Sequence, residues 1–541
     1  MFATQTFAEG PVPGQGNPVD SLPRDLLPDT PPVSITLQKS DANSALSAAA
    51  GQMVTPAHFN IDGVHSIPFE LVAKEFSPMA NQAVSVAALV AAAERVTKLY
   101  RDRGYPLSFA YVPAQNFDKN IVEVNIVEGY VEKISFTGNA SNVQGRLETI
   151  AARLRTVRPL TNAAFQRITG LMQLEPSVQI SASVTPPVTT DGASEMTVNV
   201  KRSPVTLSVN MDTTTSRLRG LVSATENGAT ALGEQITIST LQPQGTDRER
   251  YYALNYAQPI GADGVLMQVN VYDYAANPRS AALLTQGLES EYESRTTRAA
   301  VTVGYPFILD AHRNLTGTAG FYAAQNANTF AFQNALAPDI RVASQTRALS
   351  LEYSWQLSSE TSLVQASGGI YQGLGMLGAG ATNNTANVRF NRIRGQFSRT
   401  DVYAGNWGTV ISGIAQYSGN VLPQTEQISF GGRLFGMGYA ASNSTGDSGW
   451  GLAVEGNRSF VFDTAYLKRI QAYVVLDKSQ TVLNALPQPH GNLGSVGLGL
   501  RLSDMRYYSV DVSVAKPTGE RPVNEADRAL RYNLLFNYKT Q

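Results

Sequence analysis

The feature that most constrains this chain is a long carboxy-terminal region in which apolar and polar residues alternate. From Pro204 onward the sequence has no helical periodicity, and its runs follow a period of two, as strands do. Short turns rich in glycine, aspartate and proline, such as GADG at 261–264 and PTGERP at 517–522, separate these runs. The region therefore predicts a large β-sheet structure whose strands each have one apolar and one polar face.

Three runs show the alternation most clearly. Their apolar positions are Val265, Met267, Val269 and Val271; Tyr508, Val510, Val512 and Val514; and Leu530, Tyr532, Leu534, Phe536 and Tyr538. Their polar side is formed by Gln268 and Asn270; by Tyr507, Ser509, Asp511 and Ser513; and by Arg531, Asn533 and Asn537. A soluble sandwich with its apolar face inward would alternate in the same way, so the period alone does not exclude that class.

Other properties of residues 204–541 favour a membrane barrel with its apolar face outward. The region is about 338 residues long without a helical interruption, which is large for one sandwich. Many runs are about 9–11 residues long, enough to cross a bilayer when tilted. The chain also ends on a strand-like run with aromatic residues on one face. Only a closed barrel lets strands span lipid with every backbone group paired.

The region before Pro204 differs in composition and period. Residues 1–54 are rich in proline, glycine, serine and aspartate and predict a linker, with a possible short plug helix near 20–27 that Pro23 and Pro28 limit. Residues 55–129 and 130–203 predict two successive units of β-α-α-β-β order, each of about 75 residues. One α+β domain is the alternative, and the repeated order favours two modules.

Helical periodicity supports this division. Gly104 lies where a helix C-cap glycine belongs, and strands are expected at 107–112, 120–127 and 134–138. The residues expected on buried helix faces are Leu89, Ala93, Val96 and Tyr100 in the first unit, and Leu147, Ile150, Ala151, Leu154, Phe165, Ile168 and Leu171 in the second.

Composition excludes several classes of function. The 42 basic and 43 acidic residues leave a net charge of −1, which gives no basic field for nucleic acid. The absence of cysteine excludes thiol catalysis and thiolate metal sites, and four scattered histidines form no metal motif. We therefore expect no enzyme and no cofactor. No apolar run is long enough for a membrane helix, and the start MFATQTFAEG lacks signal-peptide character, so export requires a leader that has been removed.

A glycine-rich stretch, GGRLFGMGYAASNSTGDSGWG at 431–451, has two interpretations. GDSGWG is similar to the GDSGG run around a serine-protease nucleophile, which would make Ser448 catalytic. That chemistry needs a histidine base and an orienting aspartate. Only His312, in DAHRN, has even a faintly similar context, and Trp450 replaces the second glycine of GDSGG. We therefore favour a structural loop.

The order of linker, two α+β units and β region resembles the two-partner secretion transporters of Gram-negative outer membranes, the TpsB family, of haemolysin and haemagglutinin secretion-activation type. The resemblance implies two periplasmic POTRA modules before a barrel of about 16 antiparallel transmembrane strands. The segment 99–139 carries the family's tyrosine, RGY, P-x-Q and EG pattern at Tyr100, Arg103, Gly104, Tyr105, Pro113, Gln115, Glu128 and Gly129.

The stretch 427–451 resembles the family's pore-entering loop, whose core is normally GG…VRGY followed by GD.G. The matching residues are Gly431, Gly432, Arg433, Gly436, Met437, Gly438, Tyr439, Gly446 and Asp447. Met437 stands where the family has an arginine that reaches an aspartate on the inner barrel wall. Asp477 in VLDKS fits that acidic position, and Arg433 could supply the missing charge. An Arg433–Asp477 pair and a simply solvated Asp477 remain alternatives.

The resemblance implies an outer-membrane pore that recognises a β-helical exoprotein of TpsA type, an adhesin or haemolysin, through its POTRA modules and exports it without ATP. It implies lipid and lipopolysaccharide around the barrel, and periplasmic chaperones and the barrel-assembly machinery for insertion. A barrel-assembly insertase of the same superfamily is the alternative, although insertases usually have more POTRA modules. A plain diffusion porin would not need the amino-terminal modules.

Overall fold

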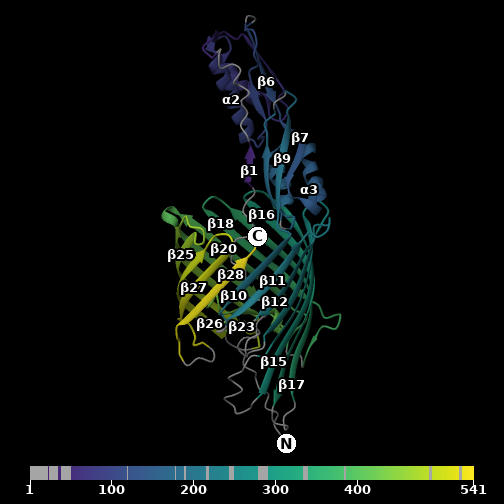
Figure 1. Ribbon diagram of the computed structural model, residues 1–541, viewed down its shortest axis with the longest axis vertical. Helices are drawn as coiled ribbons and strands as arrows, with labels where there is room; N and C mark the ends of the chain where they lie inside the picture. Colours follow the sequence, from purple (N-terminus) through teal and green to yellow (C-terminus); the bar gives the residue numbers. More distant parts are fainter. Residues whose placement is uncertain are drawn as a thin grey trace.

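The structure is a computed structural model of the 541-residue chain. Figure 1 shows a β-barrel with two smaller α+β units stacked beyond one of its ends. The residues that the structure describes are 22–23, 34–37, 50–117, 120–176, 178–187, 190–214, 218–242, 249–277, 290–332, 339–382, 386–485, 490–522 and 527–540.

The first unit follows the predicted β-α-α-β-β order. Its elements are β3 (His58–Asp62), α1 (Phe69–Phe76), α2 (Val86–Asp102), β5 (Phe109–Tyr111) and β6 (Ile121–Val127), with a small pair formed by β2 (Met53–Val54) and β4 (Val84–Ser85). The sheet order is β3-β6-β5. Helix α2 begins where the Ser85 hydroxyl accepts a hydrogen bond from the Ala88 amide. The predicted face of this helix is fully buried in the unit's core.

The second unit repeats the order. It contains β7 (Tyr130–Gly138), α3 (Gln144–Ala151), the 3-10 turns η4 (Ser141–Val143) and η5 (Ala152–Thr156), α4 (Asn162–Gln173), β8 (Val178–Val184) and β9 (Ala193–Arg202). All seven residues predicted to face inward on its helices are buried. A strand from the amino-terminal region, β1 (Ser34–Leu37), pairs in parallel with the edge strand β8, which gives the sheet order β1-β8-β9-β7.

Sixteen antiparallel strands of the described residues close the barrel, as the sequence predicted, and β10 pairs with β28 to complete the ring. A two-residue strand, β19 (Gly380–Ala381), adds to β17. The strands are β10 (Val205–Asp212), β11 (Arg219–Asn227), β12 (Gln235–Gln242), β13 (Arg250–Ile260), β14 (Val265–Ala276), β15 (Ser290–Leu309), β16 (Arg313–Phe332), β17 (Ile340–Ser358), β18 (Ser362–Gly373), β20 (Asn391–Tyr403), β21 (Trp407–Tyr417), β24 (Ser448–Val461), β25 (Arg469–Val482), β26 (His490–Ser503), β27 (Tyr508–Pro517) and β28 (Arg531–Lys539).

The wall alternates as predicted, with polar side chains inward and apolar side chains outward. In β27, Asp511 and Ser513 are buried while Val512 is exposed. In β28, Asn533 and Asn537 are buried and Tyr532 is exposed. Three strands are longer than the 9–11 residues expected. β15, β16 and β17 have 20, 20 and 19 residues and extend beyond the body of the barrel (Figure 1). No described helix is long and apolar enough to span a membrane.

The second unit rests on the turns at one end of the barrel. Arg146 forms an ion pair with Glu175 at 2.8 Å and donates to the Gly261 carbonyl in the β13–β14 turn at 3.1 Å. Arg153 pairs with Asp263 in the same turn. These contacts and the short connection from β9 into β10 mark this end of the barrel as the one that faces the two units.

Leu22 and Pro23 are buried, and Leu22 lies inside the barrel. It packs against a cluster of inward-facing residues on β12, β13 and β14 that includes Tyr251 and Tyr272. The other residues of the predicted plug helix near 20–27 lie outside the described residues. The amino-terminal region therefore has one described contact in the lumen and a second, through β1, at the second unit.

Candidate functional site

The glycine-rich stretch folds back into the barrel between β21 and β24. Within it, β22 (Ile428–Phe430) and β23 (Ser444–Gly446) form a small antiparallel pair. We call residues 427–451 the pore loop. Gly431 has φ +111°, and a Cβ atom there would lie 2.1 Å from the Ala440 carbonyl oxygen. Gly436 has φ +98° and lies against Gly431. The glycines are therefore required by a tightly folded backbone.

Asp477 on β25 binds the middle of the pore loop through backbone amides. Its carboxylate accepts hydrogen bonds from the Gly436 amide at 2.7 Å and the Met437 amide at 3.1 Å. The Ser495 hydroxyl donates to the same carboxylate at 3.1 Å and accepts a bond from the Gly438 amide at 2.9 Å. Three successive loop amides are thus held by two neighbouring strands of the wall.

These contacts replace the Arg433–Asp477 pair that the sequence suggested. No ion pair joins these two residues in the described part of the chain, and Asp477 is neither solvated nor charge-paired but buried among donors. Arg433 lies on an exposed part of the loop and lines the cavity in the lumen. Two loop amides already occupy the Asp477 carboxylate, so it needs no guanidinium partner.

Met437, at the position of the family arginine, is an apolar anchor. Its side chain is 5% exposed and packs with Ala453, Tyr473, Val475 and Ala515 of the inner wall. A Cβ atom at Gly497 would lie 2.8 Å from its sulfur, so that glycine makes room for it.

The carboxylates beside Met437 have a cation of their own. Arg501 on β26 binds Glu455 at 2.7 Å and Asp511 at 3.1 Å, and its guanidinium lies 4.0 Å from the centre of the Tyr473 ring. The Tyr473 hydroxyl donates to Asp511 at 2.7 Å. Arg501 therefore bridges both carboxylates and offsets one of their two negative charges, without a cation from the loop.

The end of the pore loop is held by Asp447 and Tyr439. Asp447 is fully buried and accepts bonds from the Leu422 amide at 2.8 Å and the Asn484 amide at 2.7 Å. Tyr439 is also fully buried and donates to the Glu520 carbonyl at 2.8 Å. A Cβ atom at Gly446 would lie 2.7 Å from the Val482 carbonyl oxygen, so this glycine permits close packing on β25.

Ser448, the residue of the protease interpretation, is engaged with the backbone. Its hydroxyl accepts a hydrogen bond from the Ser418 amide at 3.0 Å and donates to the Ser418 carbonyl at 3.1 Å. It therefore pins the first residue of β24 to the end of β21.

A contact that the sequence did not reveal holds the start of the pore loop. Glu426 forms a buried ion pair with Arg392 of β20 at 3.1 Å and accepts a bond from the Tyr322 hydroxyl of β16 at 2.7 Å. The Arg392 guanidinium also lies 4.0 Å from the centre of the Tyr371 ring. Glu426 directly precedes the recognised motif, but its partners are 34 and 104 residues away, and no local pattern indicates them.

In the first unit, Glu128 fixes the end of α2 to the loop after β3. Its carboxylate accepts bonds from the Ser66 hydroxyl at 2.6 Å, the Ser66 amide at 2.7 Å, the His65 amide at 3.0 Å and the Tyr100 hydroxyl at 2.9 Å. Burial alone would raise the pKa of Glu128, but these four bonds outweigh it and hold the pKa below its ordinary value. Burial and the bond to Glu128 raise the pKa of Tyr100.

The other motif residues of the first unit act through the backbone. Gln115 mimics a strand, because its amide group accepts from the Glu123 amide and donates to the Glu123 carbonyl, both at 2.9 Å, and also reaches the Pro113 carbonyl. The Gly104 carbonyl accepts from the Asn162 amide at 2.8 Å, and the Gly129 carbonyl accepts from the Leu160 amide at 2.9 Å.

These two glycine contacts join the first unit to the second. Tyr105 packs edge-on against Tyr100, and Arg103 is the exposed C-cap residue of α2. The motif thus positions one unit on the other.

Comparison with protein-family profiles gives two matches. Residues 54–129 match the POTRA domain, ShlB-type, and residues 192–502 match the haemolysin secretion/activation protein ShlB/FhaC/HecB. The second match covers more than half of the chain. The chain belongs to the ShlB/FhaC/HecB family. It is therefore an outer-membrane transporter of two-partner secretion, with its POTRA domain in the periplasm, and the family implies a secreted exoprotein partner.

Solved structures agree in fold. CdiB from Escherichia coli is 16% identical over 95% of this chain and 94% of its own, with a TM-score of 0.68. CdiB from Acinetobacter baumannii is 14% identical over 90% of both chains, with a TM-score of 0.59. BamA from Haemophilus ducreyi lacking POTRA domains 1–3 is 16% identical and reaches 0.51 over 90% of this chain and all of its own. At these identities the likeness concerns the fold alone. A search of curated proteins found no match.

Proposed function

We propose that the transporter receives an extended segment of a β-helical adhesin or haemolysin on its periplasmic units and passes it through the barrel without ATP. In this proposal, residues 1–54 form a linker that enters the pore, 55–129 and 130–203 form two POTRA modules, and 204–541 form the barrel. The second unit has the same element order as the first, which supports its assignment as a POTRA module.

The observation that carries this proposal is the pairing of β1 with β8. A strand that belongs to neither unit lies in parallel on the sheet edge of the second unit, with Ser34 opposite Ser181 and Leu37 opposite Val184. A sheet edge offers unpaired backbone groups that bind an extended chain, whatever its side chains. The edge that accepts β1 is therefore suited to a strand of the exoprotein.

The lumen must open for transport. Leu22 and the pore loop occupy it, and both are held there by non-covalent contacts. We propose that the chain is not an enzyme and that lipid and lipopolysaccharide surround it. Periplasmic chaperones and the barrel-assembly machinery would insert it.

The test is export of an exoprotein encoded nearby, in a Gram-negative host that produces the full-length transporter with a native leader. We expect the exoprotein in the medium for the intact transporter and not after deletion of residues 55–203, with heat-modifiable migration of the barrel as the control for insertion. If the inserted barrel exports nothing while other barrels fail to assemble without it, the insertase alternative replaces this proposal.

A sharper test addresses the β8 edge alone. The chain has no cysteine, so the pair Thr36→Cys and Ser183→Cys, which are opposite each other in the β1–β8 register, can fix β1 in place. We expect oxidation to stop export and reduction to restore it, with each single cysteine variant as the control. Unchanged export by the oxidised pair would show that the exoprotein does not need this edge.

A further inference from the structure

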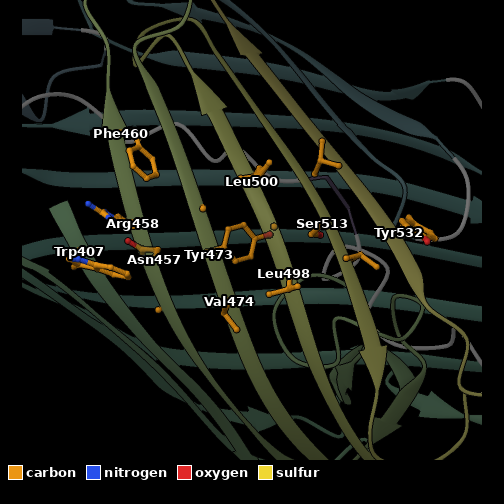
Figure 2. Close-up of a pocket in the computed structure, with 15 residues that line it drawn as sticks. Trp407, Asn457, Arg458, Phe460, Tyr473, Val474, Leu498, Leu500, Ser513 and Tyr532 are labelled. Atoms are coloured by element: carbon orange, nitrogen blue, oxygen red, sulfur yellow. The ribbon is translucent and has the colours of Figure 1, made fainter. Parts of the chain in front are cut away.

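The outer face of the barrel has an apolar groove of about 690 Å³ that crosses several strands from β21 to β28. Figure 2 shows Trp407, Arg458 and Phe460 gathered at one end of the groove and Tyr532 at the other. Its lining is on the lipid-facing side, because large apolar side chains such as Leu498 are exposed there.

The groove exists because small residues lie between large ones. Gly456 faces outward on β24, and a Cβ atom there would meet nothing within 4 Å. Ala472 on β25 lies opposite Arg458 of β24 on one side and Leu500 of β26 on the other. Its small side chain leaves a depression between these two large ones.

The charge at one end of this groove identifies its side of the membrane. Arg458 is exposed on β24, three residues before the strand ends at the rim that faces the periplasmic units. It lies opposite Trp407, the first residue of β21, and its guanidinium carbon is 5.1 Å from that ring and 5.3 Å from the Phe460 ring. Aromatic residues form girdles at the membrane interface, so this end of the groove lies at the periplasmic interface.

Arg458 faces lipid on the outer side of the barrel. Among the described residues, no carboxylate lies within ion-pair distance of it. A cation on the lipid face of a barrel is tolerated near the interface and costs far more at the midplane. Basic side chains at this depth attract anionic head groups.

We propose that the groove binds an anionic glycerophospholipid of the periplasmic leaflet. The lipid phosphate lies on Arg458, between Trp407 and Phe460, and one acyl chain crosses the small residues Gly456 and Ala472. The position at the periplasmic interface excludes lipopolysaccharide, whose phosphates lie in the opposite leaflet. This site is independent of which exoprotein the transporter exports.

The test is native mass spectrometry of the full-length transporter after reconstitution in equal amounts of phosphatidylglycerol and phosphatidylcholine. We expect the wild type to retain phosphatidylglycerol about fivefold over phosphatidylcholine, the contribution of one basic side chain near an anionic surface. Arg458→Gln should abolish this preference. Lys478→Gln is the matched control, because Lys478 is exposed on the lipid-facing side of β25 but outside the groove, and it should retain the preference.

A second variant tests the acyl-chain part of the site. Gly456→Leu projects into open space on the outer face, so the barrel should insert and show heat-modifiable migration while it loses retention of both lipids. Equal retention of the two lipids by the wild type, or an unchanged preference in Arg458→Gln, would overturn the proposal. The groove would then contact bilayer lipids without selecting an anionic head group. A dimer peak that disappears in Gly456→Leu while the lipid peaks stay would identify a second copy of the chain as the occupant.

Discussion

The start and the middle of the pore loop are held to the same barrel wall by different chemistry. At the start, Glu426 is bound by a buried arginine and a tyrosine hydroxyl. In the middle, Asp477 binds backbone amides and Met437 fills an apolar site. The first contact depends on charge supplied from a distant strand, while the second depends on the local shape of the loop. A single loop can therefore be released in two separable steps.

One reporter can follow both steps. Ser444 is buried in the pore loop, and the natural chain has no cysteine, so Ser444→Cys gives a single thiol that reacts with a maleimide only when the loop opens. The labelling rate then measures the free energy of loop opening in each variant.

The largest expected effect comes from the charged contact. Glu426→Gln removes the carboxylate that forms the buried ion pair with Arg392, and breaking such a pair typically costs about 3–5 kcal/mol. We expect labelling of the reporter to rise by about a hundredfold or more. The double variant Glu426→Gln with Arg392→Gln should recover most of this loss, because both charges of the pair are then removed. A double variant as open as the single one would show that the pair itself does not hold the loop.

The apolar contact comes next. Met437→Ala removes most of a buried side chain from a site between β24, β25 and β27, and such truncations cost about 2–5 kcal/mol. We expect a value near the lower limit, because the site borders the lumen and water can enter. Met437→Leu is the control that keeps the volume and should stay within about 1.5 kcal/mol of the wild type. Equal labelling for the alanine variant and the wild type would show that Met437 does not hold the pore loop in place.

A smaller effect is expected at Asp477. Asp477→Asn keeps one oxygen for a loop amide but places an NH₂ group against the other, so charge-assisted bonds are lost at about 1.5–3 kcal/mol. Because Arg433 is not bound to Asp477, reversing the charge at Arg433 should leave the Asp477→Asn effect unchanged in the double variant. A strong coupling between positions 433 and 477 would show that Arg433 and Asp477 form an ion pair, contrary to the structure.

The smallest effect concerns the first unit, where Glu128 also binds backbone amides. Its pKa lies below the ordinary value of about 4.3, so the charged form stabilises the fold at higher pH. That contribution is present above the unfolded pKa and is lost as the pH falls through the folded pKa. Thermal unfolding should therefore show a stability loss below about pH 4.5 that Glu128→Gln lacks. Parallel pH profiles for the two proteins would exclude this role.

The sequence predicted most of the fold because periodicity is a local property. Alternation at Val510, Asp511 and Val512 identified the faces of the wall, and the helical spacing of Leu89 and Val96 identified a buried face. Strand lengths were underestimated, since β15, β16 and β17 continue beyond the body of the barrel.

The site was predicted less completely, for a physical reason. Motif spacing located the pore loop and Asp477, but spacing does not indicate whether a side chain or a backbone amide donates hydrogen bonds to the carboxylate. The missing loop arginine suggested a substitute cation within the loop, at Arg433. The structure instead has Arg501 on the wall, 64 residues from Met437, where only the barrel register brings Glu455 and Asp511 within its reach.

The amino-terminal region has one further consequence. Pro23 lies buried beside Leu22, and β1 begins at Ser34, so the chain takes eleven Cα–Cα steps between these two residues and can span at most about 40 Å. The covalent chain therefore limits how far the contact in the lumen and the periplasmic sheet can separate. A force that draws β1 away from the membrane by more than this limit must pull Leu22 out of the pore in the same direction, so mechanical tension alone would couple capture of a substrate to clearing of its path.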